Sequence, residues 1–177
     1  MGRGNIFLVG MMGAGKTTLG KALARRMRLE FIDTDKMLVD RTGVPVAMIF
    51  EIEGEEGFRQ RESAIIAELS EGSDRVIATG GGAILSEANR QVMRRRGTVV
   101  YLRAHLEHLW ERTRHDASRP LLATPDPRAT LAKLLEDRDP LYRETAHIVV
   151  DSGSQSATSL LARVSEALRE HLPGASA

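Results

Sequence analysis

The chain has 177 residues, no cysteine, and 25 Lys and Arg against 24 Asp and Glu, which gives a formal charge of +1 at pH 7. This near-neutral, mixed charge offers no basic field for nucleic acid or a membrane surface, so we expect neither as a partner. The lack of cysteine excludes disulfide scaffolds, thiolate nucleophiles and Cys-ligated zinc. The chain carries no signal-peptide pattern or membrane-spanning stretch, and the expected location is the cytoplasm.

Short β-type runs alternate with helical segments along the chain. The runs are residues 5–9, 31–32, 75–78, 98–102 and 147–150. Five buried strands alternating with helices predict an α/β fold, a three-layer sandwich in which helices cover both faces of a five-stranded parallel sheet. Apolar spacing predicts amphipathic helices over residues 16–27, 58–69 and 159–172. The length suits one domain, which we place at residues 1–172, followed by a flexible tail at 173–177.

The first predicted strand runs directly into a phosphate-binding motif. Residues 10–18 read GMMGAGKTT, a full match to G-x-x-x-x-G-K-[ST] between a strand and a helix. Glycines let backbone N–H groups turn onto phosphate oxygens, Lys16 reaches the β- and γ-phosphates, and Thr17 offers its hydroxyl to Mg²⁺. A glycine-rich turn that binds nothing accounts for this match less well. The residues predicted to bind the triphosphate are Gly13, Ala14, Gly15, Lys16, Thr17 and Thr18.

Two carboxylates follow the second predicted strand. Asp33 and Asp35 lie two residues apart, hence on one side if the backbone stays extended, at the edge where open α/β sheets bind ligands. One is expected to serve the water shell of Mg²⁺ and the other an acceptor hydroxyl. A helix N-cap ahead of residues 36–41 is an alternative role for Asp35.

Three glycines, Gly80, Gly81 and Gly82, follow the third predicted strand. A flexible turn is the ordinary interpretation of such a run. Because these residues carry no Cβ, they also let a ligand approach the main chain closely, and we favour that interpretation beside the phosphate-binding motif.

Arginines supply the candidate positive charges. Arg59 and Glu62 share a helix face, so Glu62 can orient the guanidinium, although an exposed ion pair is the favoured interpretation of this spacing alone. Residues 113–128 contain three prolines and are interpreted as a mobile flap. Phosphoryl transfer needs positive charge delivered by an element that closes, and Arg119 on the flap suits that role. Spacing alone assigns no function to Arg138.

Taken together, these motifs resemble the shikimate kinase family over nearly the whole chain. The motifs are Gly10 to Thr18, Asp33-Thr34-Asp35, Phe58-Arg59 with Glu62, Gly80-Gly81-Gly82, Arg119-Pro120-Leu121 and Arg138-Asp139-Pro140-Leu141-Tyr142. The resemblance implies a P-loop kinase domain of the nucleoside-monophosphate-kinase type, with a substrate-binding helical region at about 35–62 and a lid at about 113–128. It also implies transfer of the ATP γ-phosphoryl to the 3-hydroxyl of shikimate, in aromatic amino acid biosynthesis. We expect a monomer.

The resemblance also implies residue roles. Lys16, Asp35 and Arg119 would be catalytic. Asp35 would bind acceptor hydroxyls, Arg59 and Arg138 would clamp the shikimate carboxylate, and the backbone of Gly80, Gly81 and Gly82 would line the pocket. Asp33, through water, would support Mg²⁺ together with Thr17. On the nucleotide side, Arg112 and Arg119 would contact ATP, as would Gln155 in the adenine loop, where Ala157 replaces a proline found in some members.

Two other functions stay open at this point. A P-loop with a lid does not define the acceptor, so a different small-metabolite kinase, such as a gluconate or nucleoside-monophosphate kinase, is one alternative. A module that holds ATP without transferring it is the other, and it predicts that the acceptor-side residues are lost.

Overall fold

The structure is a computed structural model that describes residues 4–153 and 155–172; the predicted tail at 173–177 lies outside the described residues. The elements in chain order are β1 (Asn5–Val9), α1 (Lys16–Met27), β2 (Glu30–Asp33), α2 (Thr34–Thr42), α3 (Val46–Ser70), β3 (Arg75–Ala78), the 3₁₀ helix η1 (Gly81–Leu85), α4 (Glu87–Arg96), β4 (Gly97–Arg103), α5 (Leu106–Thr113), the 3₁₀ helix η2 (Pro120–Leu122), α6 (Pro127–Thr145), β5 (Ile148–Asp151) and α7 (Ala157–His171). Over these two ranges, no helix combines the length and the apolar character that crossing a membrane requires.

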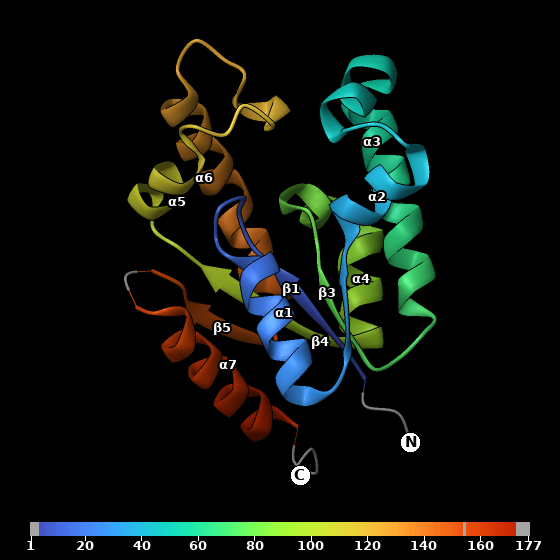
Figure 1. Cartoon of the computed structure of the whole chain (residues 1–177), viewed down its shortest axis with the longest axis vertical. Coiled ribbons are helices and arrows are strands. Elements are labelled where there is room, and N and C mark those ends of the chain that lie inside the picture. Colours follow the sequence, from blue (N-terminus) through green and yellow to red (C-terminus); the bar gives the residue numbers. More distant parts are fainter. Residues whose placement is uncertain (1–3, 154, 173–177) are drawn as a thin grey trace.

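A five-stranded parallel sheet forms the middle layer. Its strand order is β2-β3-β1-β4-β5. Helices α1 and α7 pack on one face, and α4 and α6 pack on the other (Figure 1). The predicted three-layer α/β fold is therefore confirmed. The chain leaves β1 for the far edge and returns to β3, which creates a switch point at the carboxyl ends of β1 and its neighbours, where open sheets bind ligands.

Burial follows from this layering. Every residue of the central strand β1 is buried, because helices cover the sheet on both sides. The edge strands β2 and β5 are partly exposed. The five predicted strands are all present, with bounds shifted by one residue at most. The core thus holds the carboxyl edge of the sheet rigidly beneath the site.

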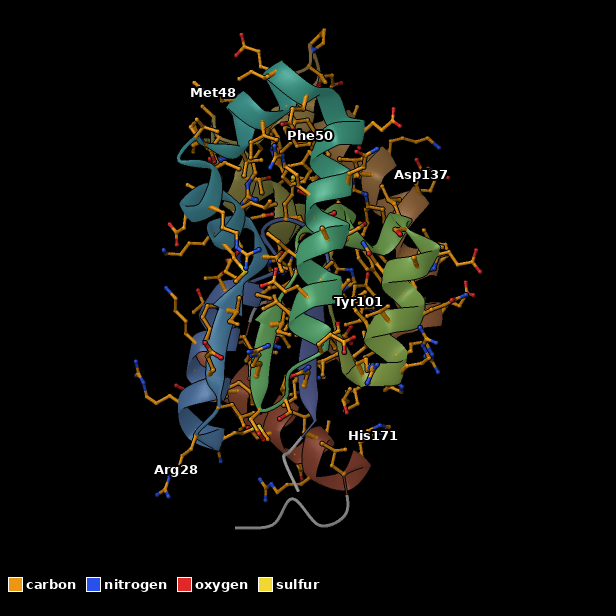
Figure 2. The ribbon with its side chains drawn as sticks, turned by 90° about the vertical axis from the view of Figure 1, so that its right-hand side faces the viewer. Arg28, Met48, Phe50, Tyr101, Asp137 and His171 are labelled. Carbon is orange, nitrogen blue, oxygen red and sulfur yellow. The ribbon has the colours of Figure 1, made fainter. Side chains whose placement is uncertain are left out.

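Two helical arms extend beyond that edge, α2 with α3 on one side and α5 with α6 on the other (Figure 1). Helix α3 bends at Gly54, whose φ of 72° and ψ of 178° are not helical. In Figure 2, Met48 and Phe50 mark the end of α3 that lies farthest from His171 at the end of α7. The predicted helix at 58–69 was only the second half of α3, because residues 46–57 lack a regular apolar stripe.

Candidate active site

The phosphate-binding loop follows β1 in the predicted conformation. Gly13 and Gly15 have φ angles of 82° and 95°, in the left-handed region that glycine adopts without strain. No side chain caps the N-terminus of α1, so its first N–H groups point outward as an anion cradle. The Nζ of Lys16 donates to the carbonyl oxygens of Gly10 and Met11 at 2.6 and 2.9 Å. Burial lowers the pKa of Lys16 to about 8.

A cavity of about 760 Å³ opens beside this loop at the carboxyl edge of the sheet. Each residue that the sequence analysis placed in a site lines it. The predicted lining residues are Gly13, Ala14, Gly15, Lys16, Thr17, Thr18, Asp33, Asp35, Arg59, Gly80, Gly81, Gly82, Arg112, Arg119, Arg138 and Gln155. Elements far apart in the chain therefore bring the predicted phosphate-binding residues and the acceptor-side residues to one space.

The two aspartates do not lie on an extended backbone as predicted, because α2 begins at Thr34. The N-cap is Asp33, so the alternative that made Asp35 the cap is wrong. One oxygen of Asp33, Oδ1, accepts from the backbone N–H groups of Asp35 and Lys36, while Oδ2 accepts from the Thr17 hydroxyl at 2.8 Å. These bonds hold Asp33 beside the phosphate loop and leave the Asp35 carboxylate directed at the cavity.

Burial and charged neighbours shift the pKa of Asp35, which lines the cavity near the phosphate-binding Lys16. Burial raises the pKa of Asp35, the neighbouring Asp33 carboxylate raises it further, and the cationic Lys16 and Arg119 oppose this. The same Asp35 charge acts on Lys16. A partly desolvated carboxylate next to a buried ammonium is the arrangement expected where a hydroxyl meets a phosphoryl group.

The cationic end of the cavity is built from Arg59 and Arg138. Arg59 donates to Glu62 at 3.0 Å. An exposed ion pair, the interpretation favoured by spacing alone, is wrong, since Glu62 is fully buried and only 21% of the Arg59 side chain is exposed. Arg138, on α6, is 2% exposed. The packing of α3 over η1 buries the ion pair between Arg59 and Glu62. Spacing along one helix does not reveal this burial.

The glycines pass directly under these charges and, at Gly81 and Gly82, begin the 3₁₀ helix η1 rather than a flexible turn. A Cβ on Gly82 would collide with the Arg59 guanidinium, and one on Gly80 would lie 2.5 Å from Glu62 Oε2. Glycine is needed here for space and not for an unusual φ, because Gly80 has an ordinary φ of −63°. The missing Cβ atoms let the charged groups converge.

Unpartnered polar atoms concentrate in this cavity. Within residues 4–153 and 155–172, six buried side-chain polar atoms have no hydrogen-bond partner. Four of them belong to cavity-lining residues: the acceptors Asp35 Oδ1 and Glu62 Oε2, and the donors Arg59 Nε and Arg138 Nη1. A buried polar group without a hydrogen-bond partner lowers the stability of the folded protein. A ligand that offers both donors and acceptors would supply the missing partners and is therefore favoured here.

Glu62 predicts a distinct pH dependence of stability. Burial raises its pKa from 4.5 to about 7. Between these two values the folded chain holds one proton more than the unfolded chain, so stability falls as pH rises, by about 3 kcal/mol over the whole window. We expect Glu62→Gln to remove this fall, measured by urea unfolding at pH 5 and at pH 7.5.

The matched control is Glu55→Gln. Glu55 also contacts Arg59, at 3.4 Å, but its side chain is half exposed. This variant should keep the wild-type difference in stability between the two pH values. An equal difference in wild type and in Glu62→Gln would contradict the burial argument.

The Thr17 hydroxyl and the Asp33 carboxylate could hold a magnesium ion. Their hydrogen bond places two hard oxygen ligands side by side at the mouth of the phosphate cradle. Mg²⁺ prefers few protein oxygens together with water and substrate phosphates. A hydroxyl and a carboxylate, with water and nucleotide phosphates completing the shell, fit a Mg²⁺ carried with a nucleotide. Across the described part of the chain, no cluster of three or more His, Cys, Asp or Glu could hold a metal ion.

On the far side of the phosphate cradle, Arg112 donates to the Gly13 carbonyl oxygen at 2.9 Å. Gln155 donates to the Asp151 carbonyl oxygen at 2.5 Å, and Ala157 starts α7. Arg119 is held by Asp116 at 2.9 Å, in the connection between α5 and α6. These side chains form the outer wall of the cavity.

Sequence reasoning assigned no role to two groups of residues, although Thr34, Phe58 and Tyr142 lie within the quoted motifs. Val46, Phe50 and Phe58 give the cavity an apolar wall, and the two phenylalanine rings pack with centroids 4.7 Å apart. Thr34 and Tyr142 do not line the cavity but bond to its glycines. The four-residue spacing from Arg138 to Tyr142 was the available signal for the latter.

A phosphate cradle with its lysine on a five-stranded parallel sheet, facing a buried polar pocket between two helical arms, defines a P-loop kinase that acts on a small molecule. The shikimate kinase sequence family matches residues 12–169. The chain belongs to the shikimate kinase family.

Relatives and solved structures agree with this assignment. A shikimate kinase of Nitrosospira multiformis is 57% identical over 165 residues, covering 93% of this chain and 85% of the relative. The structure of shikimate kinase from Acinetobacter baumannii in complex with shikimate has a TM-score of 0.94 at 43% identity, covering 97% and 96% of the two chains. A gluconokinase from Sinorhizobium meliloti, with a TM-score of 0.53 at 20% identity over 95% and 97%, shares the fold alone.

Proposed function

We propose that the chain transfers the γ-phosphoryl of ATP to the 3-hydroxyl of shikimate, giving shikimate 3-phosphate in the route to aromatic amino acids. The single observation that carries this proposal is the set of four unpartnered buried atoms, two from carboxylates and two from guanidinium groups, opposite the phosphate cradle. A small polyhydroxylated acid satisfies both kinds, with its carboxylate toward the arginines and its hydroxyls toward the aspartate.

Selectivity follows from the same groups. Arg59 and Arg138 would clamp the acid carboxylate with charge-assisted hydrogen bonds, and the backbone of Gly80, Gly81 and Gly82 would form the floor beneath the ring. An acceptor that lacks a hydroxyl or the carboxylate leaves buried groups unpaired, which site-based discrimination penalises strongly. We keep as predictions a single domain at 1–172 and a substrate-binding helical region at about 35–62, to which Gly80 to Gly82 and Arg138 would add the rest of the acceptor site.

Asp35 would orient the acceptor hydroxyl in line with the γ-phosphoryl. The new bond forms between the acceptor oxygen and the γ-phosphorus, the bond to the β-phosphate oxygen breaks, ADP leaves, and the hydroxyl proton passes to Asp35. The raised pKa of Asp35 favours its accepting that proton. Lys16 and the backbone N–H groups of residues 13–18 would bind the triphosphate, with Arg112 and Gln155 at the adenine.

A magnesium ion bound with ATP would neutralise phosphate charge, held by Thr17 directly and by Asp33 through water. Asp33 is already fixed by three hydrogen bonds, so its carboxylate is oriented before any ligand arrives. We also keep as predictions the monomeric state, the cytoplasmic location, and the lack of nucleic-acid and membrane partners.

Arg119 would stabilise the charge on the migrating phosphoryl group from the lid at 113–128. We expect Arg119→Ala to lower kcat by between about tenfold and a hundredfold, less than a fully buried donor would, because 37% of the side chain is exposed and its charge is screened. The KM for ATP should change less than kcat, measured by steady-state kinetics.

Arg114→Ala is the matched control, since Arg114 lies in the same connection and pairs with Glu111 outside the cavity. Its kinetics should equal those of wild type. A kcat for Arg119→Ala within twofold of that of Arg114→Ala would remove Arg119 from the proposed machinery.

The direct test of the function is ATP consumption by the purified protein with a panel of acceptors. We expect ADP release that depends on shikimate, and little with gluconate or nucleoside monophosphates. Consumption with gluconate instead would favour the other small-metabolite kinase. ATP binding without turnover on any acceptor would favour a non-catalytic module.

A further inference from the structure

The glycine segment 80–82 is held by two buried hydroxyl groups, one from each side of the cavity. The Thr34 Oγ1 accepts from the Gly80 backbone N–H at 3.2 Å. The Tyr142 Oη donates to the Gly81 carbonyl oxygen at 2.5 Å. Both side chains are fully buried, and neither lines the cavity. They can therefore affect a ligand only through the residues they hold.

Each hydroxyl stands beside a charged group at one end of the cavity. Thr34 directly precedes Asp35 in α2. Tyr142 lies one helical turn after Arg138 in α6, on the same face. The glycine segment is thus tied at Gly80 to the helix that carries the aspartate, and at Gly81 to the helix that carries the arginine.

The side chains of Asp35 and Arg138 lie directly against the same glycines. A Cβ on Gly80 would lie 3.0 Å from Asp35 Oδ1, and one on Gly81 would lie 3.4 Å from Arg138 Nη1. A shift of the segment would therefore change how the aspartate and the arginine lie relative to each other. The segment acts as a spacer between the anionic and the cationic end.

We propose that Thr34 and Tyr142 are positioning residues: their hydroxyls fix the glycine spacer and thereby set the distance between the groups that bind the two ends of the acceptor. This inference rests on the proposed function, because it concerns the same acceptor. It assigns the two hydroxyls to acceptor affinity and not to ATP affinity, since neither hydrogen-bonds to the phosphate-binding residues 13–18. The Tyr142 Oη also lies 3.7 Å from the Met11 Sδ, a weak acceptor, beside its 2.5 Å hydrogen bond to Gly81.

The chain offers a matched pair for the test. It has two tyrosines, Tyr101 and Tyr142, whose rings stack with centroids 4.8 Å apart. Tyr101 donates its hydroxyl to Asp139 at 2.6 Å instead of to the glycine segment. Tyr142→Phe and Tyr101→Phe therefore remove the same group from one buried cluster. Only the first removes a contact to the spacer, together with the contacts of the Tyr142 hydroxyl to Arg138 and Met11. The Thr34 variants therefore test the spacer independently.

We expect Tyr142→Phe and Thr34→Val each to raise the KM for shikimate about tenfold, because each removes one buried hydrogen bond that holds the spacer. The KM for ATP should stay within about twofold of wild type. Tyr101→Phe should keep both KM values. Thr34→Ser keeps the hydroxyl and should restore the wild-type KM for shikimate. If Tyr142→Phe does not fold, the comparison of Thr34→Val with Thr34→Ser decides.

An unchanged KM for shikimate in both hydroxyl-deleted variants, or an equal rise in the KM for ATP, would overturn the inference while wild type remains active with shikimate. A wild-type protein that consumes no ATP with shikimate would overturn the proposed function, and this inference with it.

Discussion

Asp35→Asn is expected to bind ATP as wild type does and to lower kcat with shikimate by about 10² or more, because the amide keeps the shape but loses the charge that orients the hydroxyl and accepts its proton. The structure supports a role in turnover over one in ATP binding, since Asp35 Oδ1 is buried without a partner and faces the cavity. Steady-state kinetics together with ATP titration separates the two.

The control for Asp35→Asn is Asp40→Asn. Asp40 belongs to the same helix and does not line the cavity; its exposed side chain pairs with the exposed side chain of Lys36, which does. That variant should turn over shikimate at the wild-type rate. Near-normal turnover in Asp35→Asn would reject the role of Asp35.

Arg138→Ala is expected to raise the KM for shikimate by about 10² to 10³, because a buried guanidinium that pairs with a carboxylate contributes several kcal/mol. Arg138 is 2% exposed and its Nη1 has no protein partner. Arg138→Lys keeps the charge but loses the planar fork, so an intermediate rise is expected. The KM for ATP should change little in either variant.

Arg143→Ala serves as the control on the same helix, since Arg143 pairs with Asp139 away from the cavity. Its KM for shikimate should match that of wild type. An unaltered affinity for shikimate in Arg138→Ala would contradict the carboxylate clamp.

The parts of the fold that local signals determine were predicted well. Helix α1 occupies the predicted residues 16–27, because the glycine loop before it leaves only one place for the helix to start. Residues 46–57 were missed, since a continuous apolar run at 46–50 followed by exposed glutamates shows no helical apolar period, and the bend at Gly54 separates them from the regular half of α3.

The errors in the site have a common physical cause. Either Asp33 or Asp35 satisfies the preference for a helix N-cap, and the contact of Asp33 with Thr17 from another element decides between them. The burial of Glu62 likewise depends on packing against η1, which begins some 20 residues later. Spacing along one helix predicted that Arg59 and Glu62 meet, but long-range packing determines that they meet inside the cavity.

A structure of the protein with shikimate and a non-hydrolysable ATP analogue would show whether the acceptor lies between the arginines and the phosphate cradle. We predict the shikimate carboxylate between Arg59 and Arg138, with its ring over Gly80 to Gly82 and its 3-hydroxyl between Asp35 and the γ-phosphate. Shikimate bound elsewhere, or in this cavity with its carboxylate turned away from both arginines, would contradict the account.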